Sequence, residues 1–196
     1  AITTDNSGNS YVTGYSYEES NLNDIITIKY NSIGEVLWAV NFNGTANADD
    51  EGTGISVDIY GNIYVVGTSK STVKSYDLTL LKYSSTGELI WHKEYSSSEG
   101  YKEDRGLGIV VDSESKIYVT GYTTYSDHIE IVTQKYDANG TELWTVLEDG
   151  TENHSGLEGK GLCISVSAQG NVFVGGYLTT TLTGNDIIAI KYNSAG

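Results

Sequence analysis

The sequence predicts an all-β protein with the β-propeller architecture, built from four copies of a unit of about 53 residues. Three different markers recur together along the chain. A glycine closes a motif of the type GNIYVVG at steps of 53, 54 and 55 residues, a Lys-Tyr pair recurs at steps of 53, 53 and 56, and the three tryptophans lie 53 residues apart. Because three unrelated markers keep the same step, the chain is an internal repeat.

The first two strands of each copy are predicted to form a hairpin. The first strand reads GISVD at 54–58 and GIVVD at 108–112, with CISVS at 163–167 and AITTD at 1–5 in the same register. The second strand is of the type IYVVG and ends at Gly14, Gly67, Gly121 or Gly176. The sequence DIYGN at 58–62 joins them by a tight turn, since the aspartate accepts backbone N–H bonds and glycine takes a positive φ.

The third and fourth strands form a second hairpin. The third is of the type DIITIKY, at 24–30, 77–83, 130–136 and 186–192, and the fourth holds the tryptophan, at 35–40, 88–93 and 141–146. Both are rich in β-branched and aromatic residues, and no segment has helical periodicity. The third strand is apolar on both alternating faces, as at Ile25 and Ile26. Four-stranded sheets stacked face to face around an axis bury such strands on both sides.

The four copies divide the chain into blades at approximately 1–51, 52–105, 106–160 and 161–196, within a single propeller segment. The fourth copy lacks its outer, tryptophan-bearing strand. We therefore expect the four copies to be part of a larger ring, although closure of four blades by themselves stays an alternative.

The stretch GNIYVVG…DLTLLKYSSTGELIWHKEY, at 61–95, resembles the seven-bladed beta-propeller (SBBP) repeat of bacterial and archaeal secreted and cell-surface proteins. The resemblance extends over essentially the whole chain. It implies a propeller fold, an extracellular or cell-surface location and no enzyme activity, because the family pattern has structural residues and no catalytic set. Glu130 and Ser167 depart from the pattern, which has aspartate at both positions.

The composition excludes several classes of protein. With 26 acidic and 11 basic side chains, the net charge is −15 and the pI about 4.3, so the surface repels nucleic acid. The apolar runs have the length of strands and are too short to span a membrane. Cys163 is the only cysteine, has no disulfide partner in the chain, and is expected to be a small buried residue on an inner strand. No cofactor is expected.

The long connections between the second and third strands, and from one copy to the next, should lie together on one face. Tyrosine has a rigid apolar body and a polar tip, which suits contacts with sugars and proteins. The candidate ligand-binding residues on this face are Tyr15, Tyr17, Tyr76, Tyr122, Tyr125 and Tyr177. The alternative is that these side chains pack against neighbouring loops.

Acidic residues mark the connection into the second copy. Asp49, Asp50 and Glu51 are candidate calcium ligands, because clusters of carboxylate oxygens hold this ion. They lack the spacing of a helical calcium loop, so a solvated acidic rim is the alternative. Asn43, Asn139 and Asn153 begin glycosylation sequons.

These observations favour a non-catalytic extracellular scaffold whose loops bind a protein or a glycan, with no catalytic residues in this chain. The alternative is an accessory propeller module of a larger secreted enzyme. Further blades, from the same protein or from another chain, are expected as partners.

Overall fold

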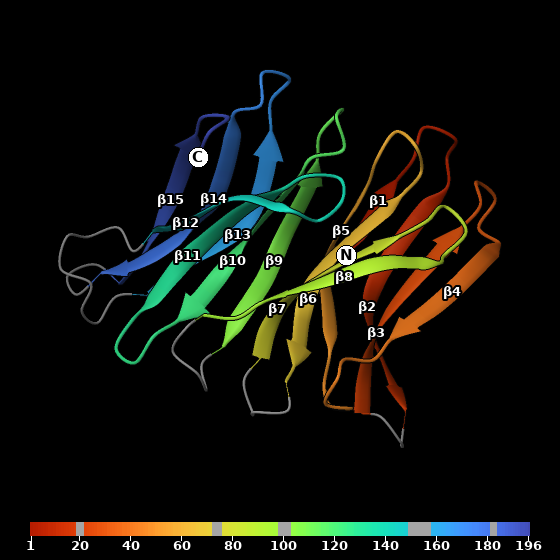
Figure 1. Ribbon diagram of the computed structural model, residues 1–196, viewed down its shortest axis with the longest axis horizontal. Coiled ribbons are helices and arrows are strands. Elements are labelled where there is room, and N and C mark those ends of the chain that lie inside the picture. The colour runs from red at the N-terminus through yellow and green to blue at the C-terminus, as the bar shows by residue number, and fades with distance from the viewer. Residues whose placement is uncertain (19–21, 72–75, 98–102, 149–157, 181–183) are drawn as a thin grey trace.

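The computed structural model describes residues 1–18, 22–71, 76–97, 103–148, 158–180 and 184–196. These residues form 15 β-strands joined by turns and connections, with no helix among them (Figure 1). It follows that no helix in the described part of the chain is long and apolar enough to span a membrane. The predicted all-β class and number of strands are confirmed.

The strands follow the sequence repeat in four groups, which we call units 1 to 4. Unit 1 comprises β1 (Ile2–Thr4), β2 (Ser10–Glu18), β3 (Leu22–Tyr30) and β4 (Val36–Phe42). Unit 2 comprises β5 (Glu51–Val57), β6 (Ile63–Lys70), β7 (Tyr76–Tyr83) and β8 (Leu89–Tyr95). Unit 3 comprises β9 (Asp104–Val111), β10 (Ile117–Thr124), β11 (Ile129–Tyr136) and β12 (Glu142–Glu148). Unit 4 comprises β13 (Glu158–Val166), β14 (Val172–Thr180) and β15 (Gly184–Tyr192).

Each unit is an antiparallel meander in which consecutive strands pair. A parallel pair between Ile129 and Glu158 joins units 3 and 4 into one seven-stranded sheet, where the sequence predicted two separate sheets. An isolated parallel bridge between Tyr76 and Glu103 links units 2 and 3 at the equivalent positions. The pair forms because β11 and β13 both begin on the side of the long connections, where their first residues meet.

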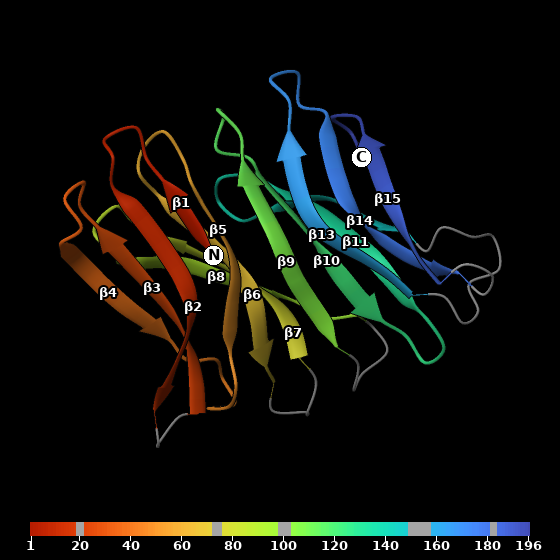
Figure 2. The same ribbon diagram turned by 180° about the vertical axis from the view of Figure 1, so that it is seen from behind.

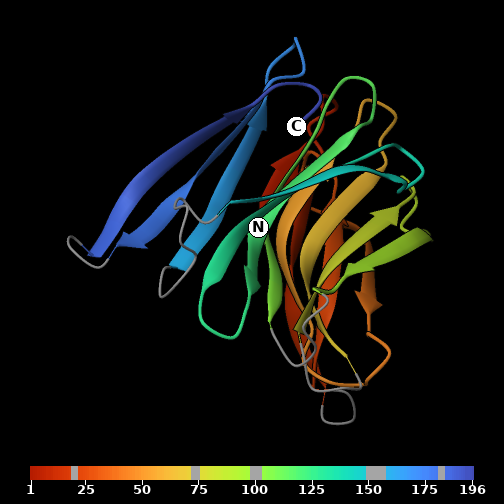
Figure 3. The ribbon, with the colours of Figure 1, turned by 60° about the vertical axis from the view of Figure 1, so that its left-hand side comes forward.

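The units stand in an open row. Their first strands β1, β5, β9 and β13 contact one another in succession, and units 1 and 4 lie at opposite ends (Figures 1 and 2). The turns between the first and second strands lie at the top of Figure 1, and the described connections at 43–50 and 125–128 lie at the other end of the strands. Seen from the side in Figure 3, the sheets do not close into a ring within this chain.

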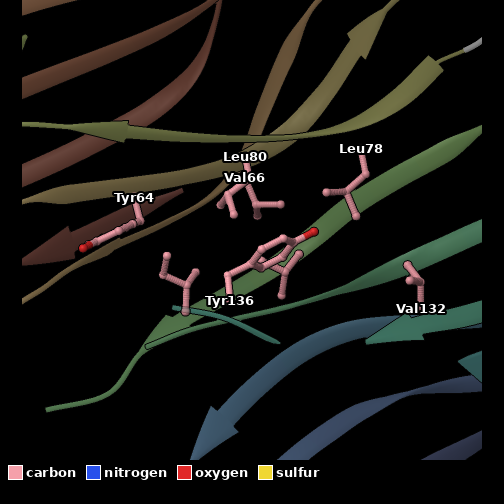
Figure 4. Close-up of a cluster of buried hydrophobic side chains, with 8 residues drawn as sticks. Tyr64, Val66, Leu78, Leu80, Val132 and Tyr136 are labelled. Carbon is pink, nitrogen blue, oxygen red and sulfur yellow. The ribbon is translucent and has the colours of Figure 1, made fainter. Parts of the chain in front are cut away.

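Three clusters of buried side chains fill the spaces between neighbouring units. Between units 2 and 3, Leu78 and Leu80 of β7 face Val132 and Tyr136 of β11 (Figure 4). Cores of this kind, between one sheet and the next, bury the third strand on both faces, which explains why its alternating residues are all apolar.

Asp58 organises the first turn of unit 2. Its Oδ1 accepts hydrogen bonds from the backbone N–H groups of Tyr60 and Asn62, both at 2.9 Å. Its Oδ2 accepts from the Asn62 amide at 2.9 Å and from the hydroxyls of Tyr64 and Ser115, each at 3.1 Å. Ser115 belongs to unit 3, so one carboxylate fixes a turn and also ties two units together.

The hydrogen-bonded aspartate and tyrosine of unit 2 have equivalents in units 1 and 3. In unit 4 both residues are replaced by others. The tyrosine hydroxyl donates to the aspartate at 2.9 Å in both Asp5–Tyr11 and Asp112–Tyr118. In unit 4 the same two positions are Ser167 and Phe173. The serine still accepts the N–H of Asn171 at 3.2 Å, and the phenylalanine has no hydroxyl that needs an acceptor. Both members changed, so no buried polar group lost its partner.

The hydrogen bonds to Asp58 predict an acid-sensitive contribution to stability. Burial raises the pKa of this carboxyl, but the hydrogen bonds from Asn62, Tyr64 and Ser115 outweigh burial and hold the pKa below its ordinary 3.8. A lowered carboxyl pKa stabilises the fold above the ordinary pKa, and this stabilisation is lost as the pH falls through the folded value. Removing one donor in Tyr64→Phe should raise the pKa of Asp58.

We therefore expect the difference in unfolding free energy between wild type and Tyr64→Phe to shrink below about pH 4. Urea unfolding in steps from pH 7 to pH 3 measures that difference. A difference that stays constant over this range would show that the hydrogen bond is not coupled to ionisation of the carboxyl.

A lysine and a tryptophan of units 1, 2 and 3 hold the outer turn of the next unit. The lysine ammonium donates to a turn carbonyl in three pairs, Lys29–Ser85 at 3.2 Å, Lys82–Ala138 at 2.8 Å and Lys135–Ser194 at 2.9 Å. The tryptophan ring lies against the glycine of the same turn, in Trp38–Gly87, Trp91–Gly140 and Trp144–Gly196. Each ammonium also lies over a tyrosine ring of its own unit, a favourable cation–π contact. This contact between units explains why the lysine, the tryptophan and the turn glycine recur at similar intervals along the sequence.

The glycine that closes the second-strand motif faces a bulge in the first strand. The pairing of first and second strands shifts register beside Gly67, Gly121 and Gly176. A Cβ at these glycines would lie 2.1, 1.8 and 2.0 Å from the carbonyl oxygens of Glu51, Arg105 and Lys160. Glycine is therefore required by the close approach of the backbone.

Cys163 lies on β13, the first strand of unit 4, but its side chain is exposed. The prediction that it is buried is wrong. The equivalent residues Gly54 and Gly108 are buried because the next unit packs over them, whereas no described residue of this chain packs over Cys163 in that way.

Candidate functional site

A cleft of about 360 Å³ opens on the side of the long connections, where units 1, 2 and 3 meet. Its volume is within the range of sites that hold small ligands. The residues that line it are Tyr15, Asn23, Asp49, Asp50, Glu51, Thr68, Tyr76 and Arg105. Two of the predicted tyrosines and all three predicted acidic residues thus meet in one place.

Two tyrosines provide aromatic surface in the cleft. Tyr15 of β2 is 59% exposed, and Tyr76 at the start of β7 is half-buried. The guanidinium of Arg105 lies 4.7 Å from the centre of the Tyr76 ring and also receives support from Glu103, which accepts its Nε–H at 3.2 Å. An arginine held this way presents its N–H donors in a fixed orientation.

Thr68 is a buried polar residue of the cleft. Its side chain is 2% exposed, and its hydroxyl has no hydrogen-bond partner among the described residues. The equivalent residues of the other units are Tyr15, Tyr122 and Tyr177, so a small side chain here leaves the space that forms the hollow. A buried hydroxyl without a partner costs about 1–3 kcal/mol, so its presence in a cleft calls for an explanation such as a ligand.

The carboxylates of Asp49 and Asp50 hold the connection into unit 2. Asp50 is buried and accepts the N–H groups of Gly44 at 2.6 Å and Lys70 at 3.0 Å, and Asp49 accepts from the Asn23 amide at 3.0 Å. No group of three or more His, Cys, Asp or Glu side chains within the described ranges is arranged to hold a metal ion. Calcium binding at 49–51 stays a prediction.

Tyr122 is buried one unit farther along the same face. The ammonium of Lys160, from unit 4, lies 4.4 Å from the centre of its ring. Burial raises the pKa of Tyr122, and the nearby positive charges of Arg105 and Lys160 oppose this only in part. The phenol is therefore neutral at physiological pH and packs between units rather than forming an open surface.

The remaining predicted tyrosines lie outside the cleft lining. Tyr125 stacks on His128 with ring centres 4.7 Å apart, Tyr17 is exposed, and Tyr177 is half-buried. The structure therefore brings together Tyr15 and Tyr76 and places the other four predicted residues elsewhere on this side of the molecule.

The sequons fall on both sides of the molecule. Asn43 and Asn139 are exposed, the first in the connection after β4 and the second in the turn before β12. Asn153 lies outside the described residues. Glycosylation at these asparagines stays a prediction.

Sequence reasoning did not single out Asn23, Thr68 or Arg105. Two signals in the repeat could have found two of them. Thr68 is the only residue of its repeat position that is not tyrosine, and the position of Arg105 changes charge along the repeat, from Glu51 in unit 2 to Arg105 and Lys160 in units 3 and 4. A departure from the repeat marks a residue that the shared fold does not require.

The sequence model of the SBBP beta-propeller repeat family matches residues 44–73. The chain therefore contains an SBBP repeat, and the resemblance inferred from the sequence is confirmed over this segment. A search of curated proteins found no match to the chain.

Several solved structures share this fold. An endo-arabinase of Bacteroides thetaiotaomicron matches with a TM-score of 0.58 and 13% identity, over 100% of this chain and 75% of its own. A periplasmic gluconolactonase of Pseudomonas aeruginosa matches with a TM-score of 0.55 and 12% identity, over 94% and 50%. A thermostable family-43 glycoside hydrolase matches with a TM-score of 0.50 and 13% identity, over 97% and 70%. This chain spans about half the length of the gluconolactonase.

These likenesses correct the expectation that the protein is not an enzyme. That expectation rested on a family pattern with structural residues and no catalytic set, and it is wrong, because the solved propellers described above are enzymes. At 12–13% identity the likeness shows a common fold and transfers no activity by itself.

Proposed function

We propose that this chain is the propeller part of an enzyme outside the cytoplasm that acts on carbohydrate, and that it binds a neutral glycan in the cleft of Tyr15, Thr68 and Tyr76. Residues 1–196 would form one propeller segment, with blades at about 1–51, 52–105, 106–160 and 161–196, inside a larger ring. The match to a beta-propeller repeat supports the propeller, the likeness to a periplasmic gluconolactonase supports a location outside the cytoplasm, and the likeness to an endo-arabinase supports action on carbohydrate.

The observation that carries the proposal is the Thr68 hydroxyl, which is buried in the cleft without a partner. A sugar would offer hydroxyl groups to Thr68 and Asn23 and an apolar ring face to Tyr15 or Tyr76. An anionic sugar suits the cleft less well, because Asp49 and Glu51 lie in its lining and the whole chain carries a charge of −15.

Thr68→Val tests the role of the hydroxyl, because it removes the polar atom and keeps the shape. We expect binding of neutral arabinan oligosaccharides, measured by calorimetry, to weaken about tenfold through loss of one hydrogen bond. The free energy of unfolding should rise by about 1 kcal/mol, since an unpaired buried hydroxyl is removed. Polygalacturonate should bind more weakly than the neutral glycan to the wild type.

Thr79→Val is the matched control. Thr79 is also buried with an unpartnered hydroxyl among the described residues, but it lies outside the cleft lining. It should gain stability and bind glycan as the wild type does. Tyr15→Ala should weaken binding, and Tyr60→Ala, an exposed tyrosine on the tight-turn side, should not. Wild-type glycan affinity in both Thr68→Val and Tyr15→Ala would refute the proposed site.

A further inference from the structure

The dipeptide Asn-Gly occurs twice in the sequence, at 43–44 and at 139–140. Asparagine before glycine is chemically labile, because glycine has no Cβ that would keep its backbone nitrogen away from the asparagine side chain. This nitrogen attacks the side-chain carbonyl carbon and closes a five-membered succinimide ring. The structure places the two copies in different surroundings, so one chain allows a direct comparison between them.

At the first copy the glycine nitrogen lies against a carboxylate. The N–H of Gly44 donates to Oδ2 of Asp50 at 2.6 Å, within the distance at which a general base takes a proton. Asp50 is 1% exposed, and its Oδ1 accepts the N–H of Lys70 at 3.0 Å, which holds the carboxylate in place. Asp50 is thus a base fixed directly on the nitrogen that attacks.

The other reacting group of the first copy is accessible. Asn43 is exposed and belongs to the connection after β4. Its side-chain nitrogen donates to Oδ1 of Asn47 at 2.6 Å, and this bond exchanges with bonds to water because both side chains are exposed. The Asn43 amide is therefore free to turn toward Gly44, and water reaches it for the second step of the reaction.

At the second copy the glycine nitrogen lies against a backbone carbonyl. The N–H of Gly140 donates to the carbonyl oxygen of Asp137 at 3.0 Å and closes a tight turn, with a φ of 78° at Gly140. The Asp137 carboxylate accepts the N–H groups of Asn139 and Thr141 at 2.9 and 2.8 Å, which fixes the backbone on both sides of the asparagine. A carbonyl oxygen is a far weaker base than a carboxylate. Asn139 is exposed as Asn43 is, so exposure does not distinguish the two copies.

We propose that Asn43 is a site of self-catalysed deamidation, with Asp50 as the general base. The Asp50 carboxylate takes the proton of the Gly44 N–H while this nitrogen attacks Cγ of Asn43. The bond between the Gly44 nitrogen and Cγ forms, the bond from Cγ to the side-chain nitrogen breaks, and ammonia leaves with the proton from Asp50. Water then opens the succinimide at either carbonyl and leaves aspartate or isoaspartate at position 43.

The reaction changes the connection that leads into the candidate cleft. It adds a negative charge next to Gly44, and isoaspartate lengthens the backbone there by one methylene group. The same connection carries Asp49 and Asp50 into the cleft lining, so glycan affinity should fall as conversion proceeds. This consequence alone rests on the proposed function. Asn43 also begins a sequon, so glycosylation and deamidation compete for one nitrogen.

Incubation of protein made without glycosylation, followed by peptide mass spectrometry, measures both asparagines in one sample. At about pH 7, Asn43 should convert about tenfold faster than Asn139 or more, since a positioned general base contributes about 10²–10⁴-fold. Between about pH 6 and pH 9, the rate at Asn139 should rise steeply with hydroxide concentration. The rate at Asn43 should rise much less over this range, because its base is part of the fold.

Asp50→Asn removes the base and keeps an oxygen that accepts the Gly44 N–H. It should lower the rate at Asn43 by about tenfold or more and leave the rate at Asn139 unchanged. Asp104→Asn is the matched control, because Asp104 has the same repeat position, is 1% exposed and accepts the N–H of Ser97 at 2.7 Å. Both rates should keep their wild-type values in this control.

Equal rates at Asn43 and Asn139 with the same pH dependence would overturn the proposal. A rate at Asn43 that is unchanged or raised in Asp50→Asn, in a variant that circular dichroism shows to be folded, would also overturn it. If this variant does not fold, the pH dependence in the wild type decides alone. Neither measurement involves a ligand, so this proposal and the glycan site can fail separately.

Discussion

Gly121→Ala is expected to lower the free energy of unfolding by about 3 kcal/mol. The new Cβ would stand 1.8 Å from the carbonyl oxygen of Arg105 and 2.9 Å from its carbonyl carbon. These atoms belong to the backbone of the paired strand β9, so no rotation of a side chain relieves the overlap. The two strands must separate at the bulge, and urea unfolding followed by circular dichroism measures the loss.

Gly14→Ala is the matched control, at the same repeat position in unit 1. No heavy atom lies within 4 Å of its added Cβ. We expect a change of no more than about 0.5 kcal/mol, because alanine there meets open space. Equal losses in the two variants would mean that glycine is needed for its own backbone conformation and not for the close approach of β9.

Asp58→Ser should lower the free energy of unfolding by about 3 kcal/mol, because several hydrogen bonds to one carboxylate are lost. Part of that loss arises because the buried Tyr64 hydroxyl loses its carboxylate acceptor in the variant. The double variant Asp58→Ser with Tyr64→Phe copies the pair Ser167 and Phe173 of unit 4. It should recover about 1–2 kcal/mol relative to Asp58→Ser alone.

A double-mutant cycle in urea measures this coupling. The expected sign is unusual, since adding Tyr64→Phe stabilises the serine background and destabilises the wild type. Additive losses would show that the aspartate and the tyrosine act independently, contrary to the hydrogen bond at 3.1 Å between them.

The architecture was predictable because each marker of the repeat serves a local or adjacent contact. The turn aspartates and turn glycines shape hairpins within one unit, and the apolar third strand packs between adjacent units that repeat the same contacts, so their pattern indicates both the strands and their stacking. The parallel pair of Ile129 with Glu158 was not predictable, since it depends on how two units lie relative to each other. Exposure of Cys163 was missed for the same reason, because its repeat position is buried only where another unit follows.

The sequence predicted on which side of the molecule the candidate site lies, but not which residues line it. The repeat placed six tyrosines on the side of the long connections, and two of them line the cleft. Tyr122 is buried because Lys160 reaches it from the neighbouring unit, a contact between residues with no shared sequence pattern. Thr68 was not predicted, because its side chain is small and has a single hydroxyl group. Its contribution to the site is the space that it leaves in the cleft.

The exchange of Asp–Tyr for Ser–Phe in unit 4 has a consequence for how such arrays evolve. Each pair lies within one hairpin, as at 167 and 173, so duplication of a whole unit copies both members together. Recombination with a crossover between the first and second strands would instead join an aspartate to a phenylalanine, or a serine to a tyrosine, and leave a buried group unpaired. Crossovers in the long connections keep every pair intact. Successful rearrangements of this gene should therefore have their breakpoints in the segments between hairpins, and chimaeras cut within the first hairpin should fold poorly.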